Sequence, residues 1–272
     1  MPLRWKAMEA AFFDLDKTVI SKSSSLALTG PMYRAGLVSR STLLKGAYAQ
    51  LVYLLIGADE KRMDKVKESL GVLTRGWEKS HVEEIVREAL TELIDPYIYL
   101  EALDLMELHR ARGRRVYIVS SSPEEVVVPL SEHLGPVKVI ASVAEVEDGK
   151  YTGGVAFYAY GEHKAEAMRA EAEREGLDLA GSYAYSDSIT DLPMLEAVGH
   201  PVAVNPDRDL RRVAVERSWQ IRDFRRPVRL RERFPKVQPP PPSVAAIVGS
   251  AAVVGAVGWW YLRRLAAERR SA

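Results

Sequence analysis

The sequence predicts an α/β fold: a Rossmann-like doubly wound parallel sheet with an inserted helical cap domain, followed by a C-terminal transmembrane helix. Three observations lead to this prediction. Short apolar runs alternate with helical patterns, a long helical stretch interrupts the alternation after the first run, and 20 consecutive uncharged residues lie near the C-terminus. Strands that alternate with helices are typical of a mainly parallel sheet that is covered on both faces.

The strands and helices of the sheet can be placed along the chain. Runs rich in Val, Ile and aromatic residues are the predicted strands, at residues 11–13, 115–120, 137–142, 182–187 and 201–205. Helical patterns lie between most of them and end at Gly113, Gly176 and Gly199. Glycine commonly closes a helix, which supports these ends. Asp148-Gly149, between two β-prone runs, predicts a hairpin within residues 144–158.

Residues 21–95 have a helical pattern throughout and fall between the first and second predicted strands. An insertion at this point leaves the sheet beyond the end of a strand. We therefore predict a separate helical cap over the strand tips. The α/β core is then formed by residues 1–20 and 96–218.

The formal net charge of +1 is unevenly distributed over the 272 residues. Residues 207–272 hold 15 Lys and Arg against 6 Asp and Glu, so the rest of the chain is net acidic. A nucleic-acid-binding protein should carry its positive surface on the folded domain, and we expect no nucleic-acid partner. The absence of cysteine excludes disulfides and thiolate metal sites.

The C-terminal region differs in composition from the core. Residues 219–242 are basic and rich in proline, which predicts an extended linker. Residues 243–262 carry no charge and are long enough to cross a bilayer as a helix. Trp259, Trp260 and Tyr261 would form an interfacial aromatic belt, and residues 263–272 a basic tail. The alternative is a buried helix of a globular domain.

We expect a membrane protein with a single-pass C-terminal anchor. The N-terminus lacks the apolar core of a secretory signal, which favours a catalytic or binding domain that stays in the cytoplasm. Two pairs of small residues spaced by four in the predicted helix, Ala245/Gly249 and Ala251/Gly255, would allow helices to pack as a homodimer.

Polar side chains follow the predicted strands. Asp14 and Asp16 come directly after the first strand, and Ser120 and Ser121 after the second. Lys164 lies near a helix start, and Asp187 and Asp191 follow the fourth strand. Ligands of parallel sheets bind beyond the carboxyl ends of the strands. Each group alone is equally consistent with a turn, a surface side chain or a helix cap, as we expect for Ser122 before Pro123, but their order favours one site.

The order of these residues resembles the haloacid-dehalogenase (HAD) superfamily. The resemblance rests on Asp14-x-Asp16-x-Thr18, Ser120 after an apolar strand, Lys164, and Asp187 with Asp191 four residues later. The chain is most similar to phosphoserine-phosphatase-like subfamily IB hydrolases, of an actinobacterial type with a C-terminal membrane segment. The resemblance spans about residues 9 to 206. It implies the predicted fold, with the cap inserted after the first motif.

The resemblance also implies a Mg²⁺-dependent phosphomonoesterase. Asp14 would be the nucleophile that forms an aspartyl phosphate, and Asp16 the general acid and then the general base. Asp14, the main-chain carbonyl of Asp16 and Asp187 would hold Mg²⁺, with Asp191 in support. Thr18, Ser120, Ser121 and Lys164 would bind the phosphate of the substrate.

Two features of the sequence narrow the range of possible substrates. Phosphoserine phosphatases have an acidic residue shortly after the first motif, whereas this chain has Lys22 and a run of serines. The predicted anchor would hold the site near a membrane, which favours a membrane-associated or lipid phosphate monoester. The alternatives are phosphoserine or another small soluble phosphate monoester, phosphotransfer to an alcohol, or a non-catalytic tail-anchored binding module.

Overall fold

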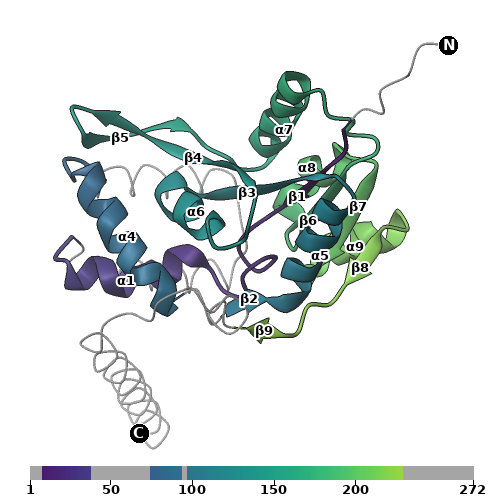
Figure 1. The fold of residues 1–272 in the computed structure, drawn as a ribbon, viewed down its shortest axis with the longest axis horizontal. Coiled ribbons are helices and arrows are strands. Elements are labelled where there is room, and N and C mark those ends of the chain that lie inside the picture. Colours follow the sequence, from purple (N-terminus) through teal and green to yellow (C-terminus); the bar gives the residue numbers. More distant parts are fainter. Residues whose placement is uncertain (1–7, 38–73, 94–96, 229–272) are drawn as a thin grey trace, which may run out of the picture. The chain divides into compact units, whose positions relative to one another are not determined.

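The computed structural model describes residues 8–37, 74–93 and 97–228 (Figure 1). The chain divides into two compact units, residues 1–234 and 235–272, and everything described here belongs to the first unit. The predicted membrane segment, residues 243–262, the basic tail after it and residues 229–242 of the predicted linker lie outside the described residues.

A seven-stranded sheet forms the centre of this unit. The strands are β1 (Ala10–Phe13), β3 (Arg115–Pro123), β4 (Lys138–Glu147), β5 (Lys150–Phe157), β6 (Tyr183–Ser186), β7 (His200–Val204) and β8 (Gln220–Arg222). Their spatial order is β5-β4-β3-β1-β6-β7-β8. All neighbours pair in parallel except β4 and β5, which form an antiparallel hairpin. The predicted Rossmann-like parallel sheet is confirmed.

Helices lie on both sides of the sheet, which explains the continuous apolar runs of its strands. The helices are α5 (Leu100–Ala111), α6 (Glu124–Ser131), α7 (Glu162–Glu175), α8 (Leu192–Glu196) and α9 (Arg208–Glu216) (Figure 1). Residues of α5 and α6 share one core cluster with Phe13, and residues of α7, α8 and α9 share the other with Phe12. Neighbouring side chains of β1 thus serve opposite faces of the sheet.

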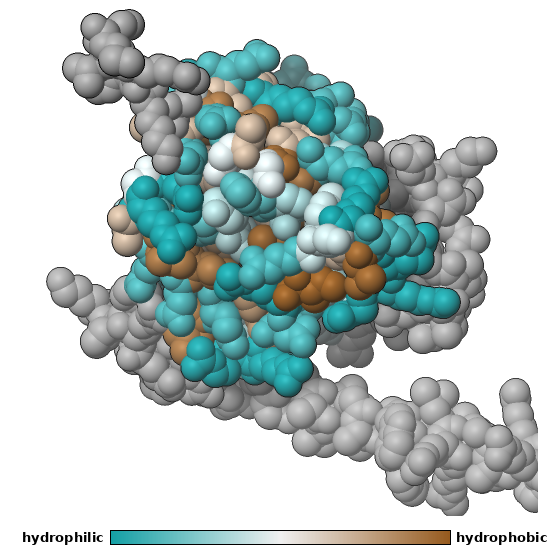
Figure 2. Space-filling view, turned by 90° about the vertical axis from the view of Figure 1, so that its right-hand side faces the viewer, coloured by the Kyte–Doolittle hydropathy of each residue, from teal (hydrophilic) through white to brown (hydrophobic). Residues whose placement is uncertain are grey.

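The outer surface contrasts with this core. Figure 2 views the molecule from the right-hand side of Figure 1. The described surface on this side is mainly hydrophilic, with smaller apolar groups between the polar side chains. The apolar residues of β1 are by contrast completely buried. Burial of these side chains is the main driving force for assembling the helices on the sheet.

The turn and helix-cap signals of the sequence predicted the local structure correctly in two places and incorrectly in one. Asp148 (φ 49°) and Gly149 (φ 77°) join β4 and β5, as the hairpin prediction required. Helix α7 closes at Gly176 in the left-handed conformation. The prediction of Ser122 as a helix cap is wrong, because β3 continues to Pro123 and α6 begins at Glu124. The side chain of Ser122 has another partner, described below.

Two helices of the predicted cap region are described, α1 (Ser24–Arg34) and α4 (Lys79–Leu93). Residues 38–73 and 94–96 of this region lie outside the described residues. The apolar side of α4 packs through Val86 and Leu90 into the core cluster that contains Phe13. A short strand, β2 (Ile98–Tyr99), follows the cap region and pairs with β9 (Pro227–Val228).

The predicted start of the linker at residue 219 is wrong. Residues 220–222 form β8 beside β7, and β9 pairs with β2. Phe224 between these strands is buried, and Asn205 binds both its N–H (2.9 Å) and its carbonyl oxygen (3.1 Å). The basic composition of this segment concealed its contacts with the core. Within the described ranges, no helix has the length and apolar character needed to cross a membrane.

Candidate active site

The candidate active site lies at the carboxyl ends of three adjacent strands, β3, β1 and β6. Asp14 follows β1, the strand between β3 and β6. Its main-chain N–H donates to the carbonyl oxygen of Tyr185 (2.9 Å), so Asp14 continues the pairing of β1 with β6. Ser120 is in the last part of β3, and Asp187 directly follows β6. Parallel pairing thus brings residues that are far apart in the sequence to one edge of the sheet.

Lys164 connects two of the predicted carboxylates. Its Nζ donates to Asp14 Oδ1 (2.7 Å) and to Asp191 Oδ2 (2.8 Å). All three side chains are buried. The lysine lies in the first turn of α7, where a cation is locally unfavourable, and the two carboxylates compensate for this position. Asp191 Oδ2 also accepts a hydrogen bond from Ser186 Oγ (2.7 Å).

Burial and charged neighbours shift the pKa values of three of these groups. Burial raises the pKa of Asp14 well above its usual value; the charge of Lys164 opposes this effect, and Asp191 and Asp187 add to it. Burial also raises the pKa of Asp187 to about 7, with Asp191 adding to the effect and Lys17 opposing it. For Lys164, burial favours the neutral form, but Asp14 and Asp191 outweigh it and the pKa lies above its usual value. One buried lysine thus faces three carboxyl groups.

Asp16 is held by a separate set of hydrogen bonds. Its Oδ1 accepts from the main-chain N–H of Ser24 (2.7 Å). Its Oδ2 accepts from Ser122 Oγ (3.0 Å) and from Ser24 Oγ (3.3 Å). Although Asp14 and Asp16 are only two residues apart, their carboxyl groups therefore bind different partners, one Lys164 and the other two serines.

The predicted phosphate-binding residues differ in what the structure shows of them. Ser120 Oγ is buried and accepts from the main-chain N–H of Ser122 (3.1 Å), which leaves its own proton for another acceptor. Ser121 is half-buried, and its carbonyl oxygen accepts from Ser142 Oγ (2.8 Å). The Thr18 hydroxyl is completely buried and has no hydrogen-bond partner among the described residues. The phosphate-binding roles of these residues stay predictions.

Three serines of the site were not predicted from the sequence. Ser24 and Ser122 bind Asp16, and Ser186 binds Asp191. Ser186 could have been noticed, because it is the last residue of a strand that ends at the site. Ser24 lies in a run of three serines, and nothing in the sequence distinguishes it from its neighbours.

The predicted ligands fit a divalent cation in charge and chemistry. Mg²⁺ prefers carboxylate and carbonyl oxygens, which Asp14, Asp187 and the main chain of Asp16 offer. Burial raises the pKa values of Asp14 and Asp187, and a further positive charge nearby would favour their ionised forms. No cluster of three or more His, Cys, Asp or Glu side chains suited to a metal ion occurs in the described part of the chain. The predicted set uses only two carboxylates, with a carbonyl as third ligand.

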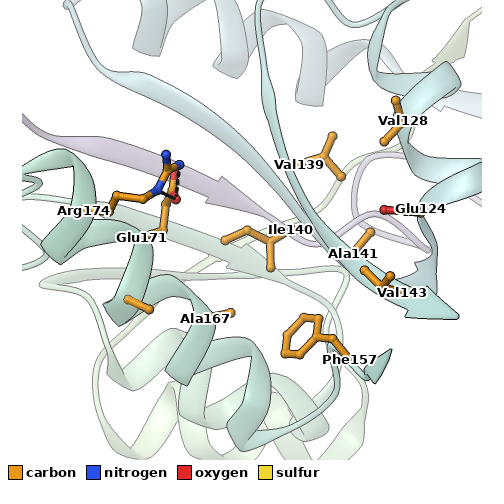
Figure 3. Close-up of a pocket in the computed structure, with 11 residues that line it drawn as sticks. Glu124, Val128, Val139, Ile140, Ala141, Val143, Phe157, Ala167, Glu171 and Arg174 are labelled. Carbon is orange, nitrogen blue, oxygen red and sulfur yellow. Dashed lines mark hydrogen bonds and ion pairs between the residues drawn. The ribbon is translucent and has the colours of Figure 1, made fainter. Parts of the chain in front are cut away.

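A groove of about 460 Å³ lies elsewhere, at the edge of the sheet beside β4 (Figure 3). Val139, Ile140 and Ala141 of β4 line it, together with Phe157 of β5 and side chains of α6 and α7. None of the predicted site residues lines this groove. We therefore place the candidate active site at the strand tips, where the polar contacts converge.

Comparison with known proteins shows to which class of enzyme the chain belongs. The model of the haloacid dehalogenase-like hydrolases matches residues 11–196, and the chain belongs to this family. The matched region contains every predicted site residue. The chain is therefore a HAD-type phosphatase, a phosphoric monoester hydrolase, in agreement with the named relatives that follow.

Particular relatives are named phosphatases. A probable phosphatase of Mycobacterium tuberculosis is 51% identical over 85% of this chain and 80% of its own length. A phosphoserine phosphatase of the same species is 34% identical over 79% of this chain and 71% of its own. An "inhibition of morphological differentiation protein" of Streptomyces azureus is 55% identical over 83% of this chain and 82% of its own.

Solved structures share the fold. A protein of unknown function from Bordetella pertussis has a TM-score of 0.71 and 27% identity, over 80% of this chain and 99% of its own. A phospho-aspartyl intermediate analogue of phosphoserine phosphatase has a TM-score of 0.58 and 19% identity, over 86% of this chain and 100% of its own. The second likeness concerns the fold alone.

Proposed function

We propose that this phosphatase is a Mg²⁺-dependent phosphomonoesterase that acts through an aspartyl phosphate on Asp14. The observation that carries the proposal is the pair of contacts from Lys164 to Asp14 (2.7 Å) and Asp191 (2.8 Å). A buried lysine fixed in this way supplies positive charge beside the nucleophile, where the charge of a phosphoryl group develops during transfer. It also occupies Asp14 Oδ1 and leaves Oδ2 to approach phosphorus.

The reaction has two steps. Asp14 Oδ2 attacks phosphorus, the bond from phosphorus to the ester oxygen breaks, and Asp16 gives its proton to the leaving oxygen. A water molecule then attacks the aspartyl phosphate while Asp16 takes its proton. The bond between phosphorus and Asp14 breaks, which releases inorganic phosphate and restores the carboxylate. Ser120 and Lys164 donate to phosphoryl oxygens throughout, with Ser121 and Thr18 in the same role.

Mg²⁺ would be held by Asp14, the carbonyl oxygen of Asp16 and Asp187, with Asp191 in support through Lys164. When bound, the ion would offset the charge of the phosphoryl group and of the carboxylates around it. The excess of buried carboxylates over cations supports this assignment.

The substrate class has two sources of support. Relatives named phosphoserine phosphatase and histidinol-phosphatase, at 34% and 31% identity, favour a small phosphate monoester. The predicted anchor favours a membrane-associated or lipid monoester. A panel of phosphoserine, histidinol phosphate and lysophosphatidate presented in vesicles would separate the two. A clear preference for lysophosphatidate would support the lipid class, and a preference for either small ester would exclude it.

Replacing the nucleophile tests the mechanism. Asp14→Asn should abolish Mg²⁺-dependent hydrolysis of p-nitrophenyl phosphate, since an amide cannot form the aspartyl phosphate. Asp209→Asn, an exposed aspartate on α9, is the matched control and should retain full activity. Acid quenching of the wild-type enzyme during turnover should trap a phosphoryl group on Asp14. Activity that survives in Asp14→Asn, or that is unaffected by EDTA, would contradict the proposal.

A further inference from the structure

We propose that Ser122 and Ser24 are positioning residues that hold the carboxyl group of Asp16 in the orientation for proton transfer. The inference rests on the proposed role of Asp16 as general acid and base. It extends that role to two serines from different parts of the fold, the end of β3 and the first turn of α1.

The two serines restrain both oxygens of Asp16. Ser24 N–H binds Oδ1 at 2.7 Å, and Ser122 Oγ binds Oδ2 at 3.0 Å. Donors on both oxygens fix the rotation of the carboxyl group as well as its position. Ser24 is completely buried and Ser122 is 3% exposed, so bulk water is a poor substitute for either hydroxyl.

The oxygen–oxygen distances indicate which acceptor each serine hydroxyl donates to. The two oxygens Ser24 Oγ and Ser122 Oγ lie 2.9 Å apart, closer than Ser24 Oγ and Asp16 Oδ2 at 3.3 Å. Each hydroxyl has one proton to donate. The distances therefore favour a chain in which Ser24 donates to Ser122, and Ser122 donates to Asp16. Ser122 is the direct contact and Ser24 orients it.

The main chain of both serines is anchored as well. Ser24 is the first residue of α1, and its N–H is one of the groups that a helix leaves without an internal partner. Asp16 Oδ1 satisfies this N–H, and the preceding Ser23 makes no side-chain capping bond. Ser122 N–H donates to Ser120 Oγ (3.1 Å), which joins the positioning of Asp16 to a predicted phosphate-binding residue.

Replacement of Ser122 should affect esters according to their leaving group. Phenolate is a poor leaving group that needs a proton, whereas p-nitrophenolate leaves readily without one. Ser122→Ala should lower kcat/KM for phenyl phosphate by about 10- to 100-fold, the scale expected for a misplaced catalytic group. For p-nitrophenyl phosphate the loss should stay within about threefold. The ratio kcat/KM reports the steps up to release of the phenol, so later hydrolysis does not obscure the comparison.

Ser24 allows the hydroxyl and the main-chain donor to be separated. Ser24→Ala removes only the hydroxyl, and Ser24→Pro removes the hydroxyl and the N–H. Proline is well tolerated at the first position of a helix, and Ser23 has the extended backbone (φ −74°, ψ 125°) that precedes proline. We expect the selective loss for phenyl phosphate to be larger in Ser24→Pro than in Ser24→Ala, while Ser24→Thr, which keeps both donors, should resemble the wild type.

Ser131→Ala is the matched control, because this buried serine at the end of α6 donates to Val128 O (2.7 Å), which is not a site residue. Equal losses for both esters in the Ser122 and Ser24 variants, or losses matched by Ser131→Ala, would overturn the positioning role. Asp16→Asn separates this failure from failure of the proposed function. If Asp16→Asn shows the selective loss and the serine variants do not, only the positioning role is wrong. If Asp16→Asn shows no selective loss, the acid role itself is wrong.

Discussion

Lys164 illustrates how much of the site depends on contacts between distant residues. It lies 150 positions from Asp14 and 27 from Asp191, yet its Nζ binds both. The sequence placed Lys164 near a helix start, where a cation is locally unfavourable unless an anion lies opposite. The structure supplies carboxylates as these anions. A lysine held by two carboxylates keeps its charge in the closed, low-dielectric setting in which it is most effective.

His109 provides a prediction of pH-dependent stability. It is buried, and its Nε2 lies 2.8 Å from the Tyr185 hydroxyl. Arg114 approaches Nδ1 (3.5 Å) and can only donate, so the imidazole proton is assigned to Nε2. Burial lowers the pKa of His109 to about 4, and Arg114, Arg112 and Arg222 contribute in the same direction. Protonation in the folded state is thus unfavourable.

The direction in which stability changes with pH follows from the pKa of His109 in the folded and in the unfolded chain. An unfolded histidine has a pKa of about 6.5, so between pH 6.5 and 4 the unfolded chain binds the additional proton. The contribution of His109 is complete above pH 6.5 and is lost as the pH falls. At pH 5 the free energy of unfolding should have dropped by about 2 kcal/mol through this residue alone.

Denaturant unfolding of wild type and His109→Gln at pH 7 and pH 5 would measure this contribution, since glutamine keeps a donor for Tyr185. The difference between the two proteins cancels the opposing contributions of Asp14 and Asp187. His81→Gln, at an exposed position of α4, is the control for loss of a histidine. Equal pH dependence in wild type and His109→Gln would refute the assignment.

The residues of the site were predictable to different degrees, for a physical reason. Asp14, Ser120 and Asp187 end apolar strands, and a parallel sheet brings such ends together whatever the details of packing. Ser24 acts through its main-chain N–H and a helix start in the cap region, which no local pattern reveals. Ser122 has the sequence context of a helix cap, and only the extension of β3 to Pro123 assigns it to Asp16.

At the scale of elements, the alternation of strands and helices predicted the sheet, but the two strands that follow β7 were missed. β8 and β9 are short and follow arginine-rich stretches, so their apolar signal is weak. The contacts that hold them come from elsewhere in the fold. Asn205 binds Phe224, and Glu101 accepts from the main-chain N–H groups of Arg225 (3.1 Å) and Arg226 (3.2 Å).

Phe224 should therefore contribute strongly to stability. It is buried and meets Tyr99 edge to face, with ring centroids 5.8 Å apart. Phe224→Ala should lower the free energy of unfolding by about 3–5 kcal/mol, as for other buried phenylalanines. Val215→Ala on α9 is the comparison, because Val215 is 66% exposed and its loss should change stability by less than about 0.5 kcal/mol. Similar melting curves for the two variants would show that residues 220–228 are dispensable for the fold.

At the scale of the whole molecule, the catalytic unit and the C-terminal region make separable predictions. Every residue proposed for catalysis lies within residues 14–191, well inside the first compact unit, 1–234. The proposed anchor belongs to residues 235–272, the second unit. Removal of the second unit should therefore leave hydrolysis of p-nitrophenyl phosphate unchanged, since this ester reaches the site from water.

The location of the protein in the cell should change with the same truncation. The full chain should sediment with membranes and require detergent for release, because 20 uncharged residues, 243–262, are sufficient to span the hydrocarbon core. The chain that ends at Phe234 should remain in the supernatant. Val253→Arg in the full chain should weaken insertion, since a charge at the centre of a spanning helix costs about 2.5–3.5 kcal/mol, whereas Val253→Leu should not. Release of the full chain by salt alone would indicate that the basic segments bind the membrane surface and that no helix spans it.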